Sequence, residues 1–269
     1  MELEDRVVVV TGGARGIGLA IAQAAVANRA GAIAVVDLDS PELEAAATNL
    51  GPTARAYAAD LSDEAAVTGV ISQIQAELGP IDLYVSNAGI GSGAGLDATA
   101  EQWDQIWRIN VAAHIHAARA LLPTVIERGH GHLLITASAA GLLSQIGDLP
   151  YSVTKHAAVA VAEWLAITYG DQGLTVSCLC PQGVKTDLLA KAMGHTSVQT
   201  VVAHGLMEPD QVADAVVEGL RQEQFLILPH PEVATFYQRR ATDPDRWLAG
   251  IRRLQARILG QPGLDPPEP

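Results

Sequence analysis

Tyr151 and Lys155 are four residues apart in a segment, 149–170, whose apolar spacing predicts a helix, so their side chains lie on one face. An ammonium beside a phenol favours the phenolate, and we expect it to lower the tyrosine pKa from about 10 toward neutrality. Such a phenol suits general acid and base catalysis on a carbonyl–alcohol pair. Ser138, 13 residues earlier at the end of an expected strand, offers a hydroxyl for the reacting oxygen. Each feature alone is common in proteins, because the Tyr-Lys spacing usually marks a solvated pair and a lone serine at a strand end is usually a turn residue.

A glycine-rich segment, TGGARGIG at 11–18, follows an apolar strand directly and opens an alanine-rich helix. Residues without Cβ allow a tight turn, and N–H groups at a helix N-terminus attract the pyrophosphate of a dinucleotide. Considered alone, a glycine-rich segment is as often a purely structural turn as a phosphate site. Here the strand before it and the helix after it favour a phosphate site. The residues expected to hold the cofactor here are Gly12, Arg15, Gly16, Ile17 and Gly18.

Asp37 ends the next expected strand, 19 residues after Gly18. A carboxylate there can accept hydrogen bonds from the ribose 2′- and 3′-hydroxyls and repels a 2′-phosphate. Leu38 supplies no cation to offset that repulsion, although Arg15 is a possible phosphate contact. The pattern therefore favours NAD over NADP, with an ordinary strand-end turn as the alternative.

Seven apolar runs alternate with longer amphipathic segments. They cover residues 6–10, 32–37, 55–59, 81–86, 132–137, 175–180 and 225–228. Near-continuous apolar runs are typical of parallel strands that are covered on both faces. The alternation predicts an α/β fold, a single Rossmann-type doubly wound parallel sheet of about seven strands with helices on both faces. Four helix starts are expected, at Ser40-Pro41, at Ser62, at Thr99 with Gln102 as a capping box, and at Glu208-Pro209.

No linker divides the chain. We expect residues 1–230 to form a dinucleotide-binding catalytic domain, with 187–208 as a lid over the substrate, and 231–269 to form a helical extension with a frayed tail. The helical pattern of the extension covers 236–258 and is rich in arginine. Because Asp243 and Asp245 are interleaved, a solvated or subunit-contacting face is favoured over a polyanion site.

The composition narrows the classes of partner. The 269 residues carry a net charge of -13, which argues against nucleic acid or an anionic membrane. No secretory signal is visible and no apolar run approaches the roughly 18 residues of a membrane span, so we expect a cytoplasmic protein. Cys178 and Cys180 lie two apart on one expected strand, which cannot close a disulfide. No metal is expected, because structural roles are favoured for His114, His116, His130 and His132.

Taken in order, these motifs make the chain resemble the short-chain dehydrogenase/reductase family over about residues 4–230. Asp60-Leu61 resembles the pair that contacts adenine, and Asn87-Ala88-Gly89 the segment that backs the cofactor and stabilises the sheet. Asn110 matches the asparagine of the family's Asn-Ser-Tyr-Lys catalytic group. The resemblance also implies a homodimer or homotetramer formed through the helices at 99–128 and 149–170.

The resemblance assigns a role to each of the four residues. Tyr151 would give or take the proton, and Lys155 would bind the nicotinamide ribose and lower the tyrosine pKa. Ser138 would position the substrate oxygen, and Asn110 would hold a water that connects Lys155 to solvent.

One motif departs from the family pattern P-G-x-V-x-T, because Gln182 stands at the glycine and a glycine follows it in PQGVKT, residues 181–186. Pro181, Val184 and Thr186 match, so they are expected to hold the nicotinamide carboxamide. Two interpretations of Gln182 are equally supported. Either the turn is locally altered, or Gln182 tolerates its backbone geometry and points an amide into the substrate pocket.

Three segments are expected to line that pocket, 90–96, 139–150 and 182–206, and the last two are rich in apolar side chains. Residues expected to contact substrate are Ser138, Gln145, Tyr151, Gln182 and Leu188. This lining favours a hydrophobic ketone or secondary alcohol. The leading hypothesis is hydride transfer between NAD(H) and such a substrate, with Tyr151 as general acid/base. A catalytically silent dinucleotide-binding regulator is the alternative, and lyase or dehalogenase chemistry is disfavoured by the intact glycine-rich turn.

Overall fold

One parallel sheet forms the centre of the computed structural model, which describes residues 1–191 and 205–260. Its strand order is β3-β2-β1-β4-β5-β6-β7. The strands are β1 (Val7–Thr11), β2 (Ala32–Asp37), β3 (Ala54–Ala58), β4 (Leu83–Ser86), β5 (Gly131–Thr136), β6 (Leu174–Leu179) and β7 (Leu226–Ile227). All seven expected strands are confirmed to within two residues at either end, because a strand buried on both faces leaves an unbroken apolar run.

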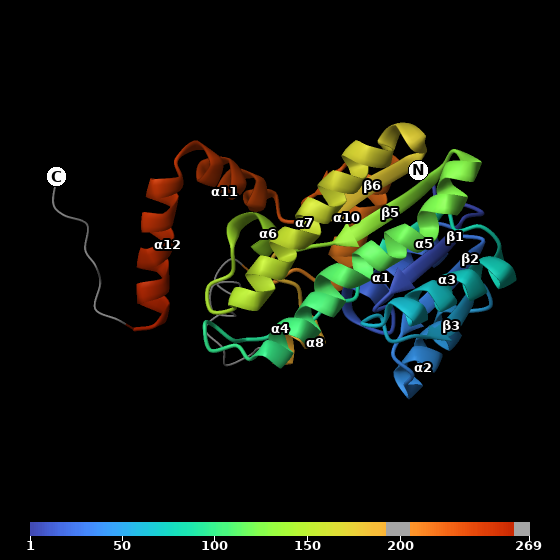
Figure 1. Cartoon of the computed structure of the whole chain (residues 1–269), viewed down its shortest axis with the longest axis horizontal. Coiled ribbons are helices and arrows are strands. Elements are labelled where there is room, and N and C mark those ends of the chain that lie inside the picture. Colours follow the sequence, from blue (N-terminus) through green and yellow to red (C-terminus); the bar gives the residue numbers. More distant parts are fainter. Residues whose placement is uncertain (192–204, 261–269) are drawn as a thin grey trace.

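Helices cover both faces of the sheet (Figure 1). One face packs against α1 (Gly16–Ala27), α2 (Pro41–Leu50) and α10 (Pro209–Arg221). The other face packs against α3 (Glu64–Leu78), α5 (Ala113–Arg128) and α7 (Leu149–Tyr169). The expected doubly wound fold is therefore confirmed. The remaining helices are α4 (Ala100–Trp107), α6 (Ala140–Leu143), α8 (Asp187–Lys191), α11 (Pro231–Thr242), α12 (Pro244–Ile258) and the short turns Arg108–Ala112 and Gly170–Gln172.

Most helix starts follow the predicted capping chemistry. Ser40 accepts the Leu43 N–H at 3.3 Å, and Thr99 and Gln102 form a reciprocal capping box. Ser62 was the wrong residue for the third start, because Asp63 takes the N-cap and accepts the Ala65 N–H at 2.9 Å. A carboxylate competes well with a hydroxyl there, since it also interacts favourably with the helix dipole.

The arginine-rich extension is two helices instead of one. Asp243 ends α11 and caps α12 by accepting the Arg246 N–H at 3.0 Å, and Pro244 follows at the first helical position. Proline cannot continue a helix but starts one well, so the pattern is interrupted there. In Figure 1, α12 stands apart from the sheet with α11 between them.

The helix Ala100–Arg128 runs through a π-helical turn, Arg108–Ala112, that joins α4 to α5. By length and composition alone it is apolar enough to cross a membrane, so the expectation that no segment approaches this criterion is wrong. Its inward face, with Ala117, Leu121 and Val125, packs in the core beside the sheet. Core helices of globular domains meet the same criterion, so the finding is weak evidence for a membrane span.

Asp82 joins the amino ends of β1 and β5 to the carboxyl end of α5. Its Oδ2 accepts the Val7 N–H of β1 at 3.0 Å, and its Oδ1 accepts from Arg128 at the end of α5 at 2.6 Å. Its backbone carbonyl accepts the His132 N–H of β5 at 2.9 Å. The carboxylate is nearly buried, so these contacts are shielded from water.

Replacing this carboxylate tests its contribution to stability. Asp82→Ala is expected to lower the free energy of unfolding by about 3 kcal/mol, because the Val7 amide and the Arg128 guanidinium lose their buried acceptor. Asp104→Ala is the matched control, since Asp104 pairs with Arg108 at 2.8 Å on an exposed helix surface and should contribute under about 1 kcal/mol. Urea unfolding measures both, and equal losses would contradict the role given to Asp82.

Candidate functional site

The candidate site lies at the carboxyl ends of the central strands, where the strand order changes direction between β1 and β4. Thr11, the last residue of β1, joins these two strands. Its hydroxyl donates to the Val85 carbonyl at 3.1 Å and accepts the Asn87 N–H at 2.8 Å. The Asn87 amide donates to the Thr11 carbonyl at 3.0 Å. The segment Asn87-Ala88-Gly89 is therefore fastened to the start of the glycine-rich turn.

The glycine-rich turn has the geometry that a dinucleotide phosphate requires. Gly12 and Gly16 have φ of +61° and +56°, which side chains with a Cβ rarely adopt. A Cβ on Gly18 would lie 2.2 Å from the Gly12 carbonyl oxygen. Arg15, the N-cap of α1, makes no side-chain capping hydrogen bond, so no capping side chain covers the first N–H groups of the helix. These N–H groups, with half-buried Ile17 behind them, fit a pyrophosphate.

Asp37 lies beside this turn at the carboxyl end of β2. Its carboxylate accepts the Ala14 N–H at 3.1 Å and the Leu38 N–H at 2.9 Å. Leu38 is exposed, and the exposed Arg15 side chain lies 3.9 Å from the Asp187 carboxylate. The Asp37 carboxylate therefore lies where an acceptor for the ribose hydroxyls of an adenosine is expected.

The expected adenine residues follow β3, on the same edge of the sheet. Asp60 is exposed and accepts the Ser62 N–H at 2.9 Å, whereas Leu61 is buried. They lie near Asp37 because β2 and β3 are parallel, with Asp37 opposite Ala58.

Lys155 is almost completely buried, with 2% of its surface exposed. Its Nζ donates to the Thr136 carbonyl at 2.9 Å, at the end of β5. A Cβ on Gly89 would lie 3.3 Å from that nitrogen, so a glycine leaves room for the ammonium. Burial lowers the pKa of Lys155 to about 8, because removal from water disfavours the charged form.

Tyr151 lies one helical turn before Lys155, with the lysine Nζ 5.7 Å from the centre of its ring. The expected lowering of the tyrosine pKa is wrong for the chain alone. Burial raises the pKa of Tyr151, while the interaction with the Ser138 hydroxyl acts in the opposite direction. The physical reason is burial, because removal from water disfavours the charged phenolate, and the nearby Asp148 carboxylate acts in the same direction. Ser138 is buried, accepts the Ala140 N–H and lies beside Tyr151, as the spacing predicted.

Asn110 lies in the π-helical turn and is fully buried. Its amide donates to the Ile90 carbonyl at 2.8 Å and its Oδ1 accepts the Ile90 N–H at 2.9 Å. A Cβ on Gly89 would lie 3.4 Å from Asn110 Oδ1 as well as close to Lys155. The four residues of the expected catalytic group are thus gathered at one edge of the sheet, and Asn110 braces the loop after β4.

The segment Pro181-Gln182-Gly183-Val184-Lys185-Thr186 follows β6, and it is called the nicotinamide turn below because the sequence predicts that it holds the nicotinamide. Gln182 and Gly183 do not have a positive φ, so Gln182 has a backbone conformation that is ordinary for a residue with a side chain. Neither interpretation of the turn is tested by this, and both stay predictions. The Gln182 Oε1 atom is buried without a hydrogen-bond partner in the described part of the chain. Thr186 is beside the glycine-rich turn, because a Cβ on Gly16 would lie 3.3 Å from its methyl group.

Gln145 and Leu188 are the remaining residues expected to contact substrate. Gln145 donates its backbone N–H to Ser152 at 2.8 Å and its amide to the Ile146 carbonyl at 3.3 Å. Leu188 is 42% exposed on α8, and its methyl group would lie 4.0 Å from a Cβ on Gly91. Most of the expected lid at 187–208 lies outside the described residues, as do residues 192–204 of the expected pocket lining.

Asp148 was missed by the sequence analysis. It caps α7 by accepting the Tyr151 N–H at 3.0 Å, and it also accepts the Gly93 N–H at 2.7 Å and the Ser92 hydroxyl at 2.6 Å. One buried carboxylate therefore joins the loop after Asn87-Ala88-Gly89 to the start of α7. Its position two residues before Pro150 was a helix-start signal that could have revealed the cap.

His230 was missed as well. It is 5% exposed, and its ring contacts the backbone of the nicotinamide turn at Gln182 and Gly183. No local signal identifies it, because the turn is 48 residues away in the sequence.

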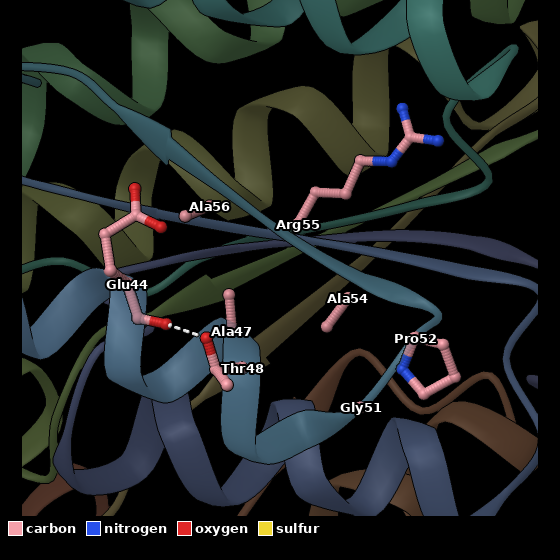
Figure 2. A pocket seen from close by; sticks show the side chains of 8 residues that line it. All are labelled: Glu44, Ala47, Thr48, Gly51, Pro52, Ala54, Arg55 and Ala56. Carbon is pink, nitrogen blue, oxygen red and sulfur yellow. Dashed lines mark hydrogen bonds between the residues drawn. The ribbon is translucent and has the colours of Figure 1, made fainter.

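A separate pocket lies at the other edge of the molecule, between α2 and the start of β3 (Figure 2). Glu44 and Arg55 point away from one another there, and the bond drawn is the local one from the Thr48 hydroxyl to the Glu44 carbonyl at 2.8 Å. It is at the amino end of β3, whereas the cofactor residues are at the carboxyl ends, so it does not belong to the candidate site.

Comparisons with known proteins agree with this geometry. A family model described as short chain dehydrogenase matches residues 6–196. The chain is 34% identical over 229 residues to 2-(S)-hydroxypropyl-CoM dehydrogenase 3 of Xanthobacter autotrophicus, covering 80% of this chain and 89% of that protein. It is 32% identical over 239 residues to 1-deoxy-11-beta-hydroxypentalenate dehydrogenase of Streptomyces exfoliatus, covering 86% of each.

A solved structure supports the same assignment. A short chain dehydrogenase/reductase of Burkholderia phymatum in complex with NAD superposes with a TM-score of 0.81 at 25% identity, over 100% of both chains. The chain belongs to the short-chain dehydrogenase family. It is therefore an oxidoreductase of a family that uses a nicotinamide dinucleotide, and the expected family is confirmed.

Two histidines are kept neutral by burial, His114 near Lys155 and His132 near the amino end of β5. Burial lowers the pKa of His114 to about 3, with the Lys155 charge acting in the same direction, and burial lowers the pKa of His132 to about 4. His114 Nδ1 lies 2.7 Å from the Ser86 hydroxyl, and His132 Nε2 lies 2.9 Å from the Ser177 hydroxyl. These are structural positions, and the described residues contain no group of three or more metal-ligating side chains.

Acid should therefore destabilise the fold. An unfolded chain binds protons on these two histidines below about pH 6.5, whereas the folded chain does not, so the free energy of unfolding falls as the pH drops from 6.5 to about 4. Each histidine adds about 1.4 kcal/mol per pH unit to that slope. Urea unfolding of His132→Gln between pH 4.5 and 7 should give a shallower slope. The control is His130→Gln on the exposed surface, and parallel curves for wild type and His132→Gln would contradict this account.

Proposed function

We propose that the chain transfers a hydride between NAD(H) and a hydrophobic secondary alcohol or ketone, with Tyr151 as the general acid/base. The observation that carries this proposal is the placement of the Tyr151 phenol, the Ser138 hydroxyl and the buried Lys155 ammonium at one sheet edge, beside a turn that fits a pyrophosphate. The bound nicotinamide would accept or supply the hydride.

The chain's own residues perform the remaining work. The Ser138 hydroxyl holds the reacting oxygen, and the Tyr151 phenol gives its proton to that oxygen in reduction and takes it back in oxidation. Lys155 adds a positive charge in a place that excludes water, which stabilises the phenolate when it forms. Asn110 holds the Ile90 backbone in place, and in this proposal it also supports the water that links Lys155 to solvent.

A silent dinucleotide-binding regulator is the alternative function. It is disfavoured because the hydroxyl, phenol and ammonium are all retained, and because keeping a lysine with 2% exposure costs stability that a non-catalytic site has no use for.

Removing the phenol oxygen tests the mechanism. Tyr151→Phe is expected to lower the turnover rate by about 100-fold or more while NADH binding persists, because only the proton-transfer group is lost. The assay follows reduced-nicotinamide absorbance with a panel of secondary alcohols and their ketones. NADH fluorescence provides the binding control, and undiminished turnover would overturn the role of Tyr151.

The NAD preference rests on Asp37. Its carboxylate is beside the glycine-rich turn, exposed Leu38 offers no cation, and Arg15 is engaged near Asp187. A 2′-phosphate at this position would meet a fixed negative charge.

Neutralising Asp37 should weaken the discrimination. Asp37→Asn keeps an acceptor for the Ala14 N–H but removes the repulsion, so the ratio of kcat/KM for NAD to that for NADP should fall by about tenfold or more. Wild type and variant are compared with both cofactors on one alcohol. Equal use of NADP by the wild type would contradict the cofactor assignment.

The substrate proposal rests on the apolar side chains near Ser138, with Leu142 buried and Leu143 and Ile146 half-buried. The relative from Streptomyces exfoliatus is named for a hydroxypentalenate, which is in keeping with a secondary alcohol on a hydrophobic skeleton. We further propose a cytoplasmic location and a small-molecule partner without nucleic acid or membrane, given the acidic net charge of -13.

Assembly as a homodimer or homotetramer is proposed through α5 and α7. On α7, Leu165 packs in the core while Trp164 is exposed. The exposed large apolar residues of these two helices are Leu149, Val153, Trp164, Ile167, Ile115 and Ile126. Side chains of this kind on adjacent helices are typical of a surface that a second copy covers.

A charge on that surface should disrupt the assembly. Ile167 is 84% exposed, so Ile167→Glu is expected to reduce the mass in light scattering to that of a monomer without unfolding the chain. Leu248→Glu on α12 is the matched control for an exposed apolar residue away from α7. An unchanged mass for Ile167→Glu would contradict the proposed interface.

A further inference from the structure

His230 connects the C-terminal extension to the nicotinamide turn. It stands at the N-cap of α11, yet its ring does not cap that helix. Its Nδ1 accepts the Gln182 N–H at 3.1 Å, and its Nε2 contacts the Gly183 carbonyl at 3.1 Å. Because a backbone N–H can only donate and a carbonyl can only accept, the ring is neutral and carries its proton on Nε2.

Only one of the two backbone groups that His230 contacts has a second hydrogen-bond partner. The Gly183 carbonyl also accepts the Met207 N–H at 2.9 Å, and Met207 in turn accepts the Lys185 N–H at 3.0 Å. Among the described residues, His230 is the only hydrogen-bond acceptor for the backbone N–H of Gln182. Without an acceptor on Nδ1, the Gln182 N–H would lose its partner at the position where this chain departs from its family.

The other end of α11 reaches the opposite wall of the site. Arg240 donates to the Leu142 carbonyl in α6, and its Nη1 lies 3.3 Å from His156 Nε2. His156 follows Lys155 and donates from Nδ1 to the Ser152 carbonyl at 2.8 Å. Figure 1 shows α11 beside α6 and leading away from the end of the sheet. The helix therefore braces both the turn after β6 and the wall formed by α6 and α7.

We propose that His230 is a positioning residue that holds the nicotinamide turn through its neutral ring. The ring sets the backbone of Gln182 and Gly183, and thereby the direction in which Val184 and Thr186 face the carboxamide of the cofactor. The extension thus contributes to cofactor binding although none of its residues in this inference touches the cofactor. The inference rests on the proposed function, because it concerns the turn assigned to nicotinamide.

Three substitutions separate the two contacts. His230→Asn keeps an acceptor near Nδ1, His230→Gln keeps a donor near Nε2, and His230→Ala keeps neither. Because the Gln182 backbone N–H needs an acceptor at the Nδ1 position, His230→Ala and His230→Gln are expected to raise the Kd and KM for NADH by about tenfold, with a smaller change in kcat. His230→Asn is expected to stay near wild type. His130→Asn, on the exposed surface, is the matched control.

Hydrogen exchange of the protein without cofactor supplies the second measurement. The Gln182 amide should exchange faster in the Ala and Gln variants and remain protected in the Asn variant. If the Ala variant does not fold, the contrast between Asn and Gln carries the test. Asn and Gln variants that bind NADH equally and protect Gln182 equally would overturn the inference. Failure of the wild type to bind NADH would instead overturn the proposed function, while the exchange result still tests the His230 contact.

Discussion

A lysine ammonium kept out of water is the constraint on which the site depends. Lys155 is 2% exposed, and burying a charge is costly unless it is hydrogen-bonded, as it is here to the Thr136 carbonyl at 2.9 Å. Its neighbours fit this requirement, since Gly89 leaves room for the nitrogen and His114 is held neutral beside it. Burial lowers the pKa of Lys155 to about 8, and it places a positive charge one helical turn from the Tyr151 phenol.

The fold brings the partners of this charge together from distant parts of the sequence. Parallel strands end at one edge, and the change of direction between β1 and β4 leaves an opening there for a dinucleotide. Thr11 fastens the glycine-rich turn to the segment after β4, and Asp148 fastens the next loop to α7. Stability and function are therefore coupled, because the same buried hydrogen bonds that hold the loops also orient Tyr151.

Much of this was predictable from sequence because its signals are local. Continuous apolar runs predicted the strands, and the glycine spacing and the apolar spacing around Tyr-x-x-x-Lys predicted the glycine-rich turn and α7. Errors arose where the outcome depends on tertiary contacts. The raised pKa of Tyr151 depends on its burial in the folded chain, and the contact of His230 depends on a turn 48 residues away in the sequence. The break between α11 and α12 at Pro244 does have a local signal, because proline cannot continue a helix, but helical periodicity alone does not show it.

Titration of Lys155 tests most directly whether a desolvated ammonium lies beside Tyr151. The chain contains three lysines, Lys155, Lys185 and Lys191, so lysine labelled with 13C at Cε gives a spectrum that Lys155→Met assigns. The account predicts a resonance that titrates near pH 8, well below the value of about 10.4 usual for a solvated lysine. A Lys155 resonance that titrates near 10.4 would contradict the claim that a desolvated ammonium stands beside Tyr151, and the proposed proton transfer would lose its physical basis.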